Sequence, residues 1–202
     1  KKGYLYKGYT IQPYSPAAGT GLSSHELNQP GCYRDVKDTT CTAQFKVKVE
    51  SGKLKGIVGE GLLYALAWTT TPWTLPSNTA LCVGPKIDYV IVKGENPYTK
   101  IEAYYLLAEA RLAAYAKELG EEPEVLWRGK GTDLEGVQYE QLIPWANPGE
   151  GAFKIILGDY VTTEDGTGIV HIAPTFGADD AFVAKKAGVP GMVFITKKGE
   201  QR

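Results

Sequence analysis

LLYALAWTTTPWTLPSN, residues Leu62–Asn78, is the most informative stretch of the sequence. Its first part, Leu62–Thr70, is apolar and aromatic and ends in threonines, which is typical of a buried β-strand. Pro72 and Pro76 then stop regular structure, because proline cannot donate a backbone hydrogen bond. A threonine run alone is ordinarily strand surface. Here the chain must leave the sheet, and the exposed amides and hydroxyls beside a tryptophan suit a small polar ligand.

Further segments have the patterns of strands. In Ala43–Val49 apolar residues alternate with polar ones, as in a half-buried strand. Thr79–Val83 and Tyr89–Val92 are expected to pair as a hairpin around Gly84-Pro85. The remaining expected strands are Tyr139–Leu142, Ile155–Tyr160 and Gly168–Ile172.

Two segments have helical spacing. Lys100–Leu119 repeats apolar residues at helical intervals, with Thr99 as N-cap and Gly120 as its stop. A second, shorter helix is expected over Asp179–Ala187. Because strands dominate and no βαβ repeat is evident, we predict an α/β fold with a mixed, barrel-like β-sheet and flanking helices.

The first 45 residues are rich in Gly, Pro, Ser and Thr and have little periodicity. We interpret Tyr4–Pro13 as a short strand with its turn, and Ser15–Asn28 and residues 30–42 as loops. The expected division is a connecting arm over residues 1–42 and a compact domain over residues 43–202. The sequence lacks an initial Met, so we expect a fragment of a longer protein.

The composition limits the function classes. Hydrophobic residues make up 43% of the chain, enough for a packed core, and the net charge of −1 provides no overall field for nucleic acid. The first 60 residues carry nine Lys/Arg and five acids, which indicates either a local basic patch or a solvated arm. Three cysteines without a C-x-x-C pair, and no long apolar run, predict a reduced cytoplasmic domain with no metal site and no membrane span.

A second informative stretch is GTGIVHIAPTFGADD, residues 166–180. His171 lies near the end of a predicted strand and is followed by a Pro/Gly loop. Asp179 and Asp180 come next, at the start of a predicted helix. Taken singly, His171 fits a satisfied strand residue, and acids favour any helix N-terminus. Together they form a plausible pocket lip at which one carboxylate can bind an ammonium. No phosphate loop or nucleophile elbow is present, so any hydrolysis is expected to use a positioned water.

Both stretches resemble the editing insertion that isoleucyl-, valyl- and leucyl-tRNA synthetases share. W-T-T-T-P-W-T-L-P-x-N and G-T-G-x-V-H-x-A-P, with Asp nine residues after the His, are similar to the isoleucyl type. Thr71-Pro72 stands where the valyl and leucyl types carry Arg-Pro. The segment Ser15–Asn28 resembles the connection to the catalytic body of those enzymes, whose own H-I-G-H and K-M-S-K-S motifs are missing here.

The resemblance implies that this domain hydrolyses valine wrongly esterified to the isoleucine tRNA and excludes isoleucine by size. It implies that Asp180 holds the substrate ammonium and that His171 limits side-chain size. The other implied site residues form the pocket or contact the terminal adenosine: Thr69, Thr70, Thr71, Trp73, Thr74 and Asn78. Of these, Trp73 is either a stacking residue or core packing, and Asn78 either supports the loop or touches the adenosine.

The resemblance also implies partners. These are the 3′ end of the isoleucine tRNA carrying valine and the rest of the synthetase in the same chain, while ATP and Mg²⁺ belong to the complete enzyme and no cofactor is expected in this domain. Three alternatives stay open: a tRNA-acceptor binding module without hydrolysis, a structural insert with a decayed site, and valyl-type editing of threonine. The sequence does not rank hydrolysis of the tRNA ester against hydrolysis of valyl-adenylate.

Overall fold

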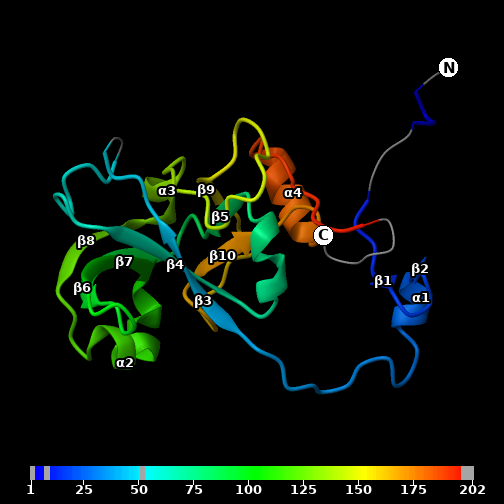
Figure 1. The fold of residues 1–202 in the computed structure, drawn as a ribbon, viewed down its shortest axis with the longest axis horizontal. Helices are drawn as coiled ribbons and strands as arrows, with labels where there is room; N and C mark the ends of the chain where they lie inside the picture. Colours follow the sequence, from blue (N-terminus) through cyan, green and yellow to red (C-terminus); the bar gives the residue numbers. More distant parts are fainter. Residues whose placement is uncertain (1–2, 7–9, 51–52, 197–202) are drawn as a thin grey trace.

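The computed structural model describes residues 3–6, 10–50 and 53–196, which build a strongly curved mixed sheet with short helices around it (Figure 1). Among the described residues the sheet has eight strands in the order β8-β6-β7-β4-β10-β5-β9, with β3 added on β4. The strands are β3 Cys41–Lys46, β4 Leu63–Thr69, β5 Ala80–Val83, β6 Asp88–Glu95, β7 Glu102–Ala108, β8 Val125–Lys130, β9 Lys154–Leu157 and β10 Ile169–Ile172.

The helical segments are short. Those around the sheet are η1 Pro72–Ser77, η2 Glu109–Tyr115, α2 Ala116–Leu119, α3 Gly131–Leu134 and α4 Ala178–Lys186. The barrel-like α/β fold predicted from the sequence is confirmed, as are the strands near 43–49, 62–70, 155–160 and 168–172 and the helix near 179–187, each with slightly shifted ends.

Strand β4 organises the sheet because it has three neighbours. Its whole length pairs with β3 in antiparallel register. On its other edge, Leu63–Ala65 pairs with β7 in parallel, whereas Trp68 alone pairs with Val170 of β10. The sheet therefore divides along β4 into a β7-β6-β8 wing, which pairs with its first residues, and a β10-β5-β9 wing, which pairs at Trp68 near its end.

The β10-β5-β9 wing curls back onto β3. Residues 136–140 lie between β9 and β3: the Tyr139 amide donates to the Phe153 carbonyl, and the Lys48 amide donates to the Gln138 carbonyl. Isolated bridges at Gln138 and Tyr139 complete the connection. This closes a small barrel, and it replaces the strand predicted at Tyr139–Leu142, which is wrong beyond Tyr139 because the chain bends away at Leu142.

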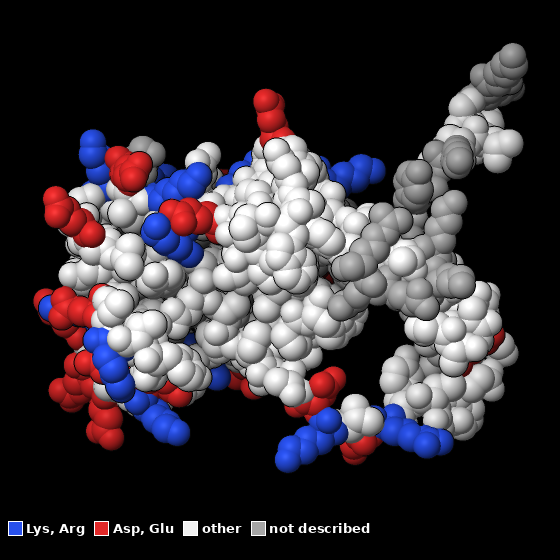
Figure 2. Space-filling view, viewed as in Figure 1, with Lys and Arg blue, Asp and Glu red and all other residues white. Residues whose placement is uncertain are grey.

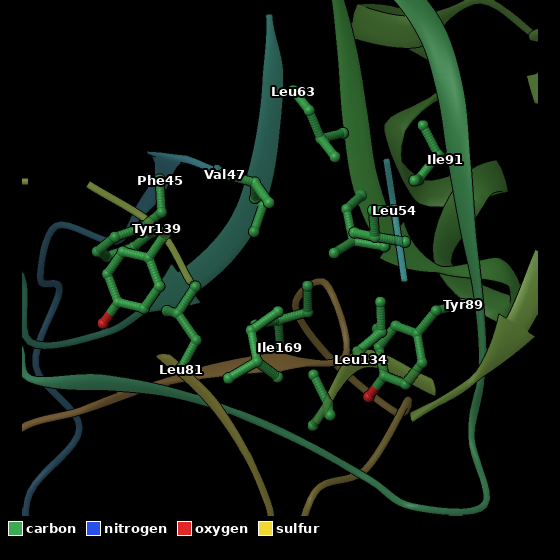
Figure 3. Packing of buried hydrophobic residues seen from close by; sticks show 14 of the residues in the cluster. Phe45, Val47, Leu54, Leu63, Leu81, Tyr89, Ile91, Leu134, Tyr139 and Ile169 are labelled. Atoms are coloured by element: carbon green, nitrogen blue, oxygen red, sulfur yellow. The ribbon is translucent and has the colours of Figure 1, made fainter. Parts of the chain in front are cut away.

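The barrel interior is filled by apolar side chains from nearly every strand (Figure 3). The largest fully buried members include Phe45, Leu63, Leu81, Tyr89 and Tyr139. Tyr139 lies beside Phe45 with the two rings edge to face at 5.4 Å between centroids. Burial of this apolar surface is the main favourable contribution to folding.

The helix predicted over Lys100–Leu119 is wrong in its first half. Residues Glu102–Ala108 form β7, which lies between β6 and β4 and is buried along most of its length. Asn96 begins the connection by accepting the amides of Tyr98 and Thr99 on its side chain, so these residues form a tight turn. The aromatic residues have strand propensity, and sheet pairing on both edges overrides the helical spacing. Only the C-terminal turns are helical, and they end at Gly120 as predicted.

The hairpin predicted from Thr79–Val83 and Tyr89–Val92 is also wrong. Both segments are strands, but β5 pairs with β10 and β9, whereas β6 pairs with β7 and β8. A turn does form at Gly84, whose carbonyl accepts the Ile87 amide. The two strands then enter different wings, so local turn geometry does not decide their partners.

The N-terminal part extends away from the sheet (Figure 1). Ser15–Asn28, expected as a loop, holds the hairpin β1 Tyr14–Ser15 and β2 Thr20–Gly21 and the capped helix α1 Ser24–Leu27. Of the strand expected at Tyr4–Pro13, residues 7–9 lie outside the described residues, and the described remainder is not strand. In the described part of the chain, no helix is long and apolar enough to cross a membrane. Basic and acidic side chains are interspersed on the face in Figure 2.

Candidate active site

The two stretches singled out in the sequence line one pocket of about 410 Å³ at the division of the sheet. The first stretch contributes the end of β4 and the start of η1, and the second contributes β10 and the start of α4. The lining residues are Trp68, Thr69, Thr70, Thr71, Trp73, Thr74, Val170, His171, Ala173, Phe176, Gly177 and Asp180. Seven of the eight site residues predicted from the sequence are in this set. Asn78 is not.

The threonines form one wall and differ in exposure. Thr69 and Thr74 are buried, and Thr69 accepts the Thr71 amide on its hydroxyl at 3.1 Å. Thr70 and Thr71 are exposed at the pocket surface. Pro72 opens the 3₁₀ helix η1 at its first turn, where no amide donor is needed, so the chain turns sharply out of β4. Thr70 and Thr71 are thus the threonines that a ligand can reach, and the Thr71 hydroxyl also lies 3.3 Å from that of Thr69 and 3.4 Å from that of Thr74.

The His171 imidazole forms a second wall and is held on both sides. Its Nδ1 lies 3.0 Å from the side-chain nitrogen of Asn78, and its Nε2 lies 2.8 Å from the Thr74 hydroxyl. Asn78 is 2% exposed and sits behind the ring. Between the two roles that the sequence left open for Asn78, the geometry therefore favours support of the site over contact with a ligand.

The protonation of His171 follows from its surroundings. Burial lowers the pKa of His171 to about 4 from an ordinary 6.5, because the imidazolium would lose its hydration. The Asn78 nitrogen also donates to the Ala80 carbonyl, so it is a donor toward Nδ1 as well. The ring is therefore neutral near pH 7 with its hydrogen on Nε2, and neither nitrogen is free to accept a proton from water.

Asp180 lines the pocket from the first turn of α4. Its Oδ2 accepts the Ala173 amide at 2.9 Å, and among the described residues this is the hydrogen bond recorded for its carboxylate. Burial raises the pKa of Asp180, an effect that the Ala173 amide opposes and the neighbouring Asp179 reinforces. Asp179, by contrast, is exposed and does not line the pocket. Asp180 thus offers spare acceptor capacity toward a cation in a partly desolvated site.

Two aromatic rings mark the mouth of the pocket. Trp73 from η1 and Phe176 from the loop before α4 meet edge to face at 5.4 Å between centroids. Trp73 is 52% exposed, so it is not a core residue. Phe176 was not predicted as a site residue, although it lies in the second stretch. Gly177, also unpredicted, leaves room for Asp180, since a Cβ there would lie 3.0 Å from the Asp180 Cγ.

Comparisons with curated proteins identify the relatives of the chain, although no family model matches it. The chain is 65% identical over 216 residues to the isoleucine–tRNA ligase of Bacteroides fragilis, an alignment that covers 100% of the chain and 19% of that enzyme. It is 59% identical over its whole length to the isoleucine–tRNA ligase of Porphyromonas gingivalis, again covering 19% of that enzyme. The matching enzyme of Treponema denticola is 46% identical over 94% of the chain. The chain thus spans about a fifth of these relatives.

Solved structures with the same fold include a synthetase editing domain. The P. knowlesi cytosolic leucyl-tRNA synthetase editing domain matches with a TM-score of 0.58 and 15% identity, covering 74% of this chain and 62% of that one. The GlLeuRS-CP1 structure matches with a TM-score of 0.56 and 20% identity, covering 74% and 65%. The chain therefore belongs to the isoleucine–tRNA ligase family, as a segment with the fold of a class I synthetase editing domain.

Proposed function

We propose that this domain hydrolyses the ester bond between valine and the isoleucine tRNA. The observation that carries the proposal is the pocket, which is lined by a carboxylate with spare acceptor capacity, by exposed threonines and by a neutral imidazole that is already fully hydrogen-bonded. Such a site suits a small, positively charged acyl group with an apolar side chain, and every aminoacyl ester carries an α-ammonium.

Asp180 binds the α-ammonium in this proposal. A carboxylate–ammonium pair in a partly dry pocket is a strong, directional contact. The arriving cation also counteracts the burial that raises the pKa of Asp180, so binding favours the ionised carboxylate. With the ammonium fixed at this end, the amino-acid side chain extends toward His171 and the buried end of the threonine wall.

His171 limits the size of that side chain. Because Asn78 and Thr74 hold both ring nitrogens, the ring resists displacement. Valine and isoleucine differ by one methylene, which changes the binding free energy in an apolar pocket by only about 1–3 kcal/mol. The isoleucine–tRNA ligases are the standard illustration of that limit. Steric exclusion by a fixed wall adds rejection of the larger product.

The chemical step uses a positioned water. The water oxygen forms a bond to the ester carbon, the bond from that carbon to the ribose oxygen breaks, and the ribose oxygen takes a proton, which releases valine and tRNA. His171 is not the base, since its Nδ1 is occupied and burial keeps its pKa near 4. The hydroxyls of Thr70 and Thr71 orient the water, and we expect no metal or cofactor to be needed in this domain.

The tRNA end is bound at the mouth of the pocket. Trp73 is half exposed there, beside Phe176, and a flat indole stacks well on a nucleobase. The rest of the synthetase, in the same polypeptide as in the relatives, would deliver the mischarged end.

The proposal is tested by the decay of isoleucine tRNA charged with radiolabelled valine or isoleucine. With the domain present, the valyl ester should decay well above its spontaneous rate, and the isoleucyl ester should persist. If the domain binds the charged tRNA and neither ester decays faster, it is a binding module and the hydrolytic proposal is wrong.

A further inference from the structure

Tyr139 lies behind the candidate site, deep in the barrel, and the proposed hydrolysis does not account for it. Its side chain is 1% exposed, packed edge to face against Phe45 and Phe153. In Figure 3 the ring lies at one end of the apolar cluster with its hydroxyl directed away from the other labelled side chains. That hydroxyl donates to the side-chain oxygen of Asn78 at 2.7 Å.

The hydroxyl is a permanent donor. Burial raises the pKa of Tyr139 well above its ordinary 10, so the group keeps its proton at any pH at which the protein is studied. A buried phenol ordinarily finds a partner, and a main-chain carbonyl would serve packing equally well. Here the partner is Asn78, whose side-chain nitrogen also contacts Nδ1 of His171.

The Asn78 amide has a defined orientation because its neighbours have fixed roles. Its nitrogen lies 2.8 Å from the Ala80 carbonyl, which can only accept, so the nitrogen must face that way. Its second N–H then points to His171 Nδ1, and its oxygen receives the Tyr139 hydroxyl. Both N–H groups and the oxygen of the Asn78 amide therefore have a partner.

The arrangement continues to the pocket wall. With Nδ1 accepting, the His171 hydrogen is on Nε2 and is donated to the Thr74 hydroxyl. Thr74 in turn donates to the Thr71 carbonyl at 2.8 Å. All donors therefore point one way, from Tyr139 through Asn78, His171 and Thr74 to the turn that carries the exposed threonines.

We propose that Tyr139 is a positioning residue for the hydrolytic site, acting through Asn78 to hold His171 as the Nε2–H tautomer against the pocket. The inference rests on the proposed function, since the position of the ring matters for turnover only if the ester is hydrolysed there. Without the hydroxyl, the Asn78 oxygen is buried and unpaired. A shift of the side chain that regains a partner for this oxygen draws the Asn78 nitrogen away from Nδ1. Nδ1 then loses its donor, so the Nδ1–H tautomer, in which Nε2 accepts the Thr74 hydroxyl, becomes competitive and the donation to Thr74 is lost.

The test compares three proteins: the unsubstituted chain, Tyr139→Phe and the matched control Tyr89→Phe. Phe keeps the packing of the ring and deletes only the hydroxyl. Tyr89 is equally buried and its hydroxyl is also hydrogen-bonded, to the Gly168 carbonyl at 2.6 Å, but it does not touch Asn78 or His171. Imidazole ¹⁵N shifts and couplings report the His171 tautomer, and the decay of valine ester on isoleucine tRNA reports turnover.

We expect an Nε2–H imidazole in the unsubstituted chain and in Tyr89→Phe. Tyr139→Phe should contain a substantial Nδ1–H population and hydrolyse the valyl ester about two- to tenfold more slowly, the effect of one lost hydrogen bond. An Nδ1–H imidazole in the unsubstituted chain overturns the inference, and that measurement stands even if Tyr139→Phe fails to fold.

The two readouts also separate the possible failures. A slower Tyr139→Phe with an unchanged tautomer contradicts the route through His171. A changed tautomer with an unchanged rate makes Tyr139 a structural residue only. If the unsubstituted chain hydrolyses no ester while its imidazole is Nε2–H, the proposed function fails and the hydrogen-bond arrangement stands.

Discussion

His171 and Asp180 line the same pocket, and they differ in how much of their hydrogen-bonding capacity the protein uses. The imidazole of His171 has a protein partner at both nitrogens. The carboxylate of Asp180 accepts one backbone amide and retains capacity for more. Burial acts on both groups in the same sense, lowering the pKa of the imidazole and raising that of the carboxylate, so both are shifted toward neutrality.

The difference supports the separate tasks that we propose for them. A side chain whose hydrogen-bonding positions are all occupied cannot bind a polar atom of a ligand without losing an existing hydrogen bond, so it is suited to form a wall. A group with free acceptor sites in a partly dry pocket is completed by a cation. In the sequence these two tasks came from the family resemblance and not from the residues themselves, because the contacts that distinguish His171 from Asp180 are made by Asn78, Thr74 and Ala173.

Removing the charge of Asp180, the carboxylate with spare acceptor capacity, should have the largest effect on activity. Asp180→Asn keeps an acceptor for the Ala173 amide but removes the charge, at a cost of about 1.5–3 kcal/mol for a charged hydrogen bond. We expect valyl-ester hydrolysis to fall about ten- to a hundredfold in single-turnover decay assays. The control is Asp179→Asn, which removes the exposed neighbouring carboxylate. Equal losses in the two variants would contradict the assignment of the ammonium to Asp180.

Removing the fully hydrogen-bonded imidazole of His171 should change the specificity of hydrolysis more than its rate. His171→Ala removes the wall, and relief of a one-methyl clash is worth about 1–3 kcal/mol. The ratio of isoleucyl- to valyl-ester decay should rise about tenfold, while valyl-ester decay falls less than in Asp180→Asn. If both rates collapse, His171 acts in the chemical step. If neither the ratio nor the rates change, His171 is a packing residue.

The comparison also predicts acid sensitivity of the fold. His171 has a folded pKa of about 4, below its unfolded value near 6.5. Its stabilising contribution is therefore present above pH 6.5 and is lost as the pH falls toward 4, because the unfolded state binds the proton first. Between pH 7 and pH 5 this amounts to about 2 kcal/mol in the free energy of unfolding. Asp180, with its raised pKa, acts in the opposite direction and reduces the net loss.

Urea unfolding at the two pH values measures this slope, and His171→Gln supplies the control, since it keeps a polar side chain that does not titrate. The variant should lose less stability between pH 7 and pH 5 than the unsubstituted chain. Parallel losses in the two proteins would show that His171 is not the titrating group.

A subtler change displaces Asp180 without removing it. In Gly177→Ala the new Cβ lies 3.0 Å from the Asp180 Cγ, so the carboxylate must shift by a few tenths of an ångström. We expect a loss of about two- to fivefold in valyl-ester hydrolysis, since small misplacements cost less than removal of a contact. Gly191→Ala creates an equally tight contact at 3.0 Å with the Thr175 side chain, away from Asp180, and should leave the rate unchanged.

The fold was predictable where local pattern and tertiary partners agree. Leu62–Thr70 is apolar and β-prone and indeed forms the strand with three neighbours. Residues Glu102–Ala108 combine helical spacing with strand-forming aromatic residues, and only the presence of β4 and β6 on either side decides for the strand. The Gly84 turn likewise does not reveal that the strands around it join different wings.

The site was predictable as two motifs, because chemically unusual residues cluster in each. No pattern in the sequence marks Tyr139, the third part of the chain that contributes to the site. Tyr139 lies 61 positions from Asn78 along the chain in a segment with no distinctive motif, and it reaches the site only because the barrel closes there. A buried aromatic residue in such a segment is ordinarily core, and its hydroxyl contact is visible only in three dimensions.

The central claim is that Asp180 and His171 have different tasks in the pocket. The structure of the domain bound to a non-hydrolysable valyl-adenosine analogue tests this claim most directly. We predict the valyl ammonium within hydrogen-bond distance of the Asp180 carboxylate. The isopropyl group should lie against His171, and the imidazole should keep its contacts to Asn78 and Thr74. An ammonium bound elsewhere, or a ligand polar atom that replaces Asn78 or Thr74 on the imidazole, would contradict the account.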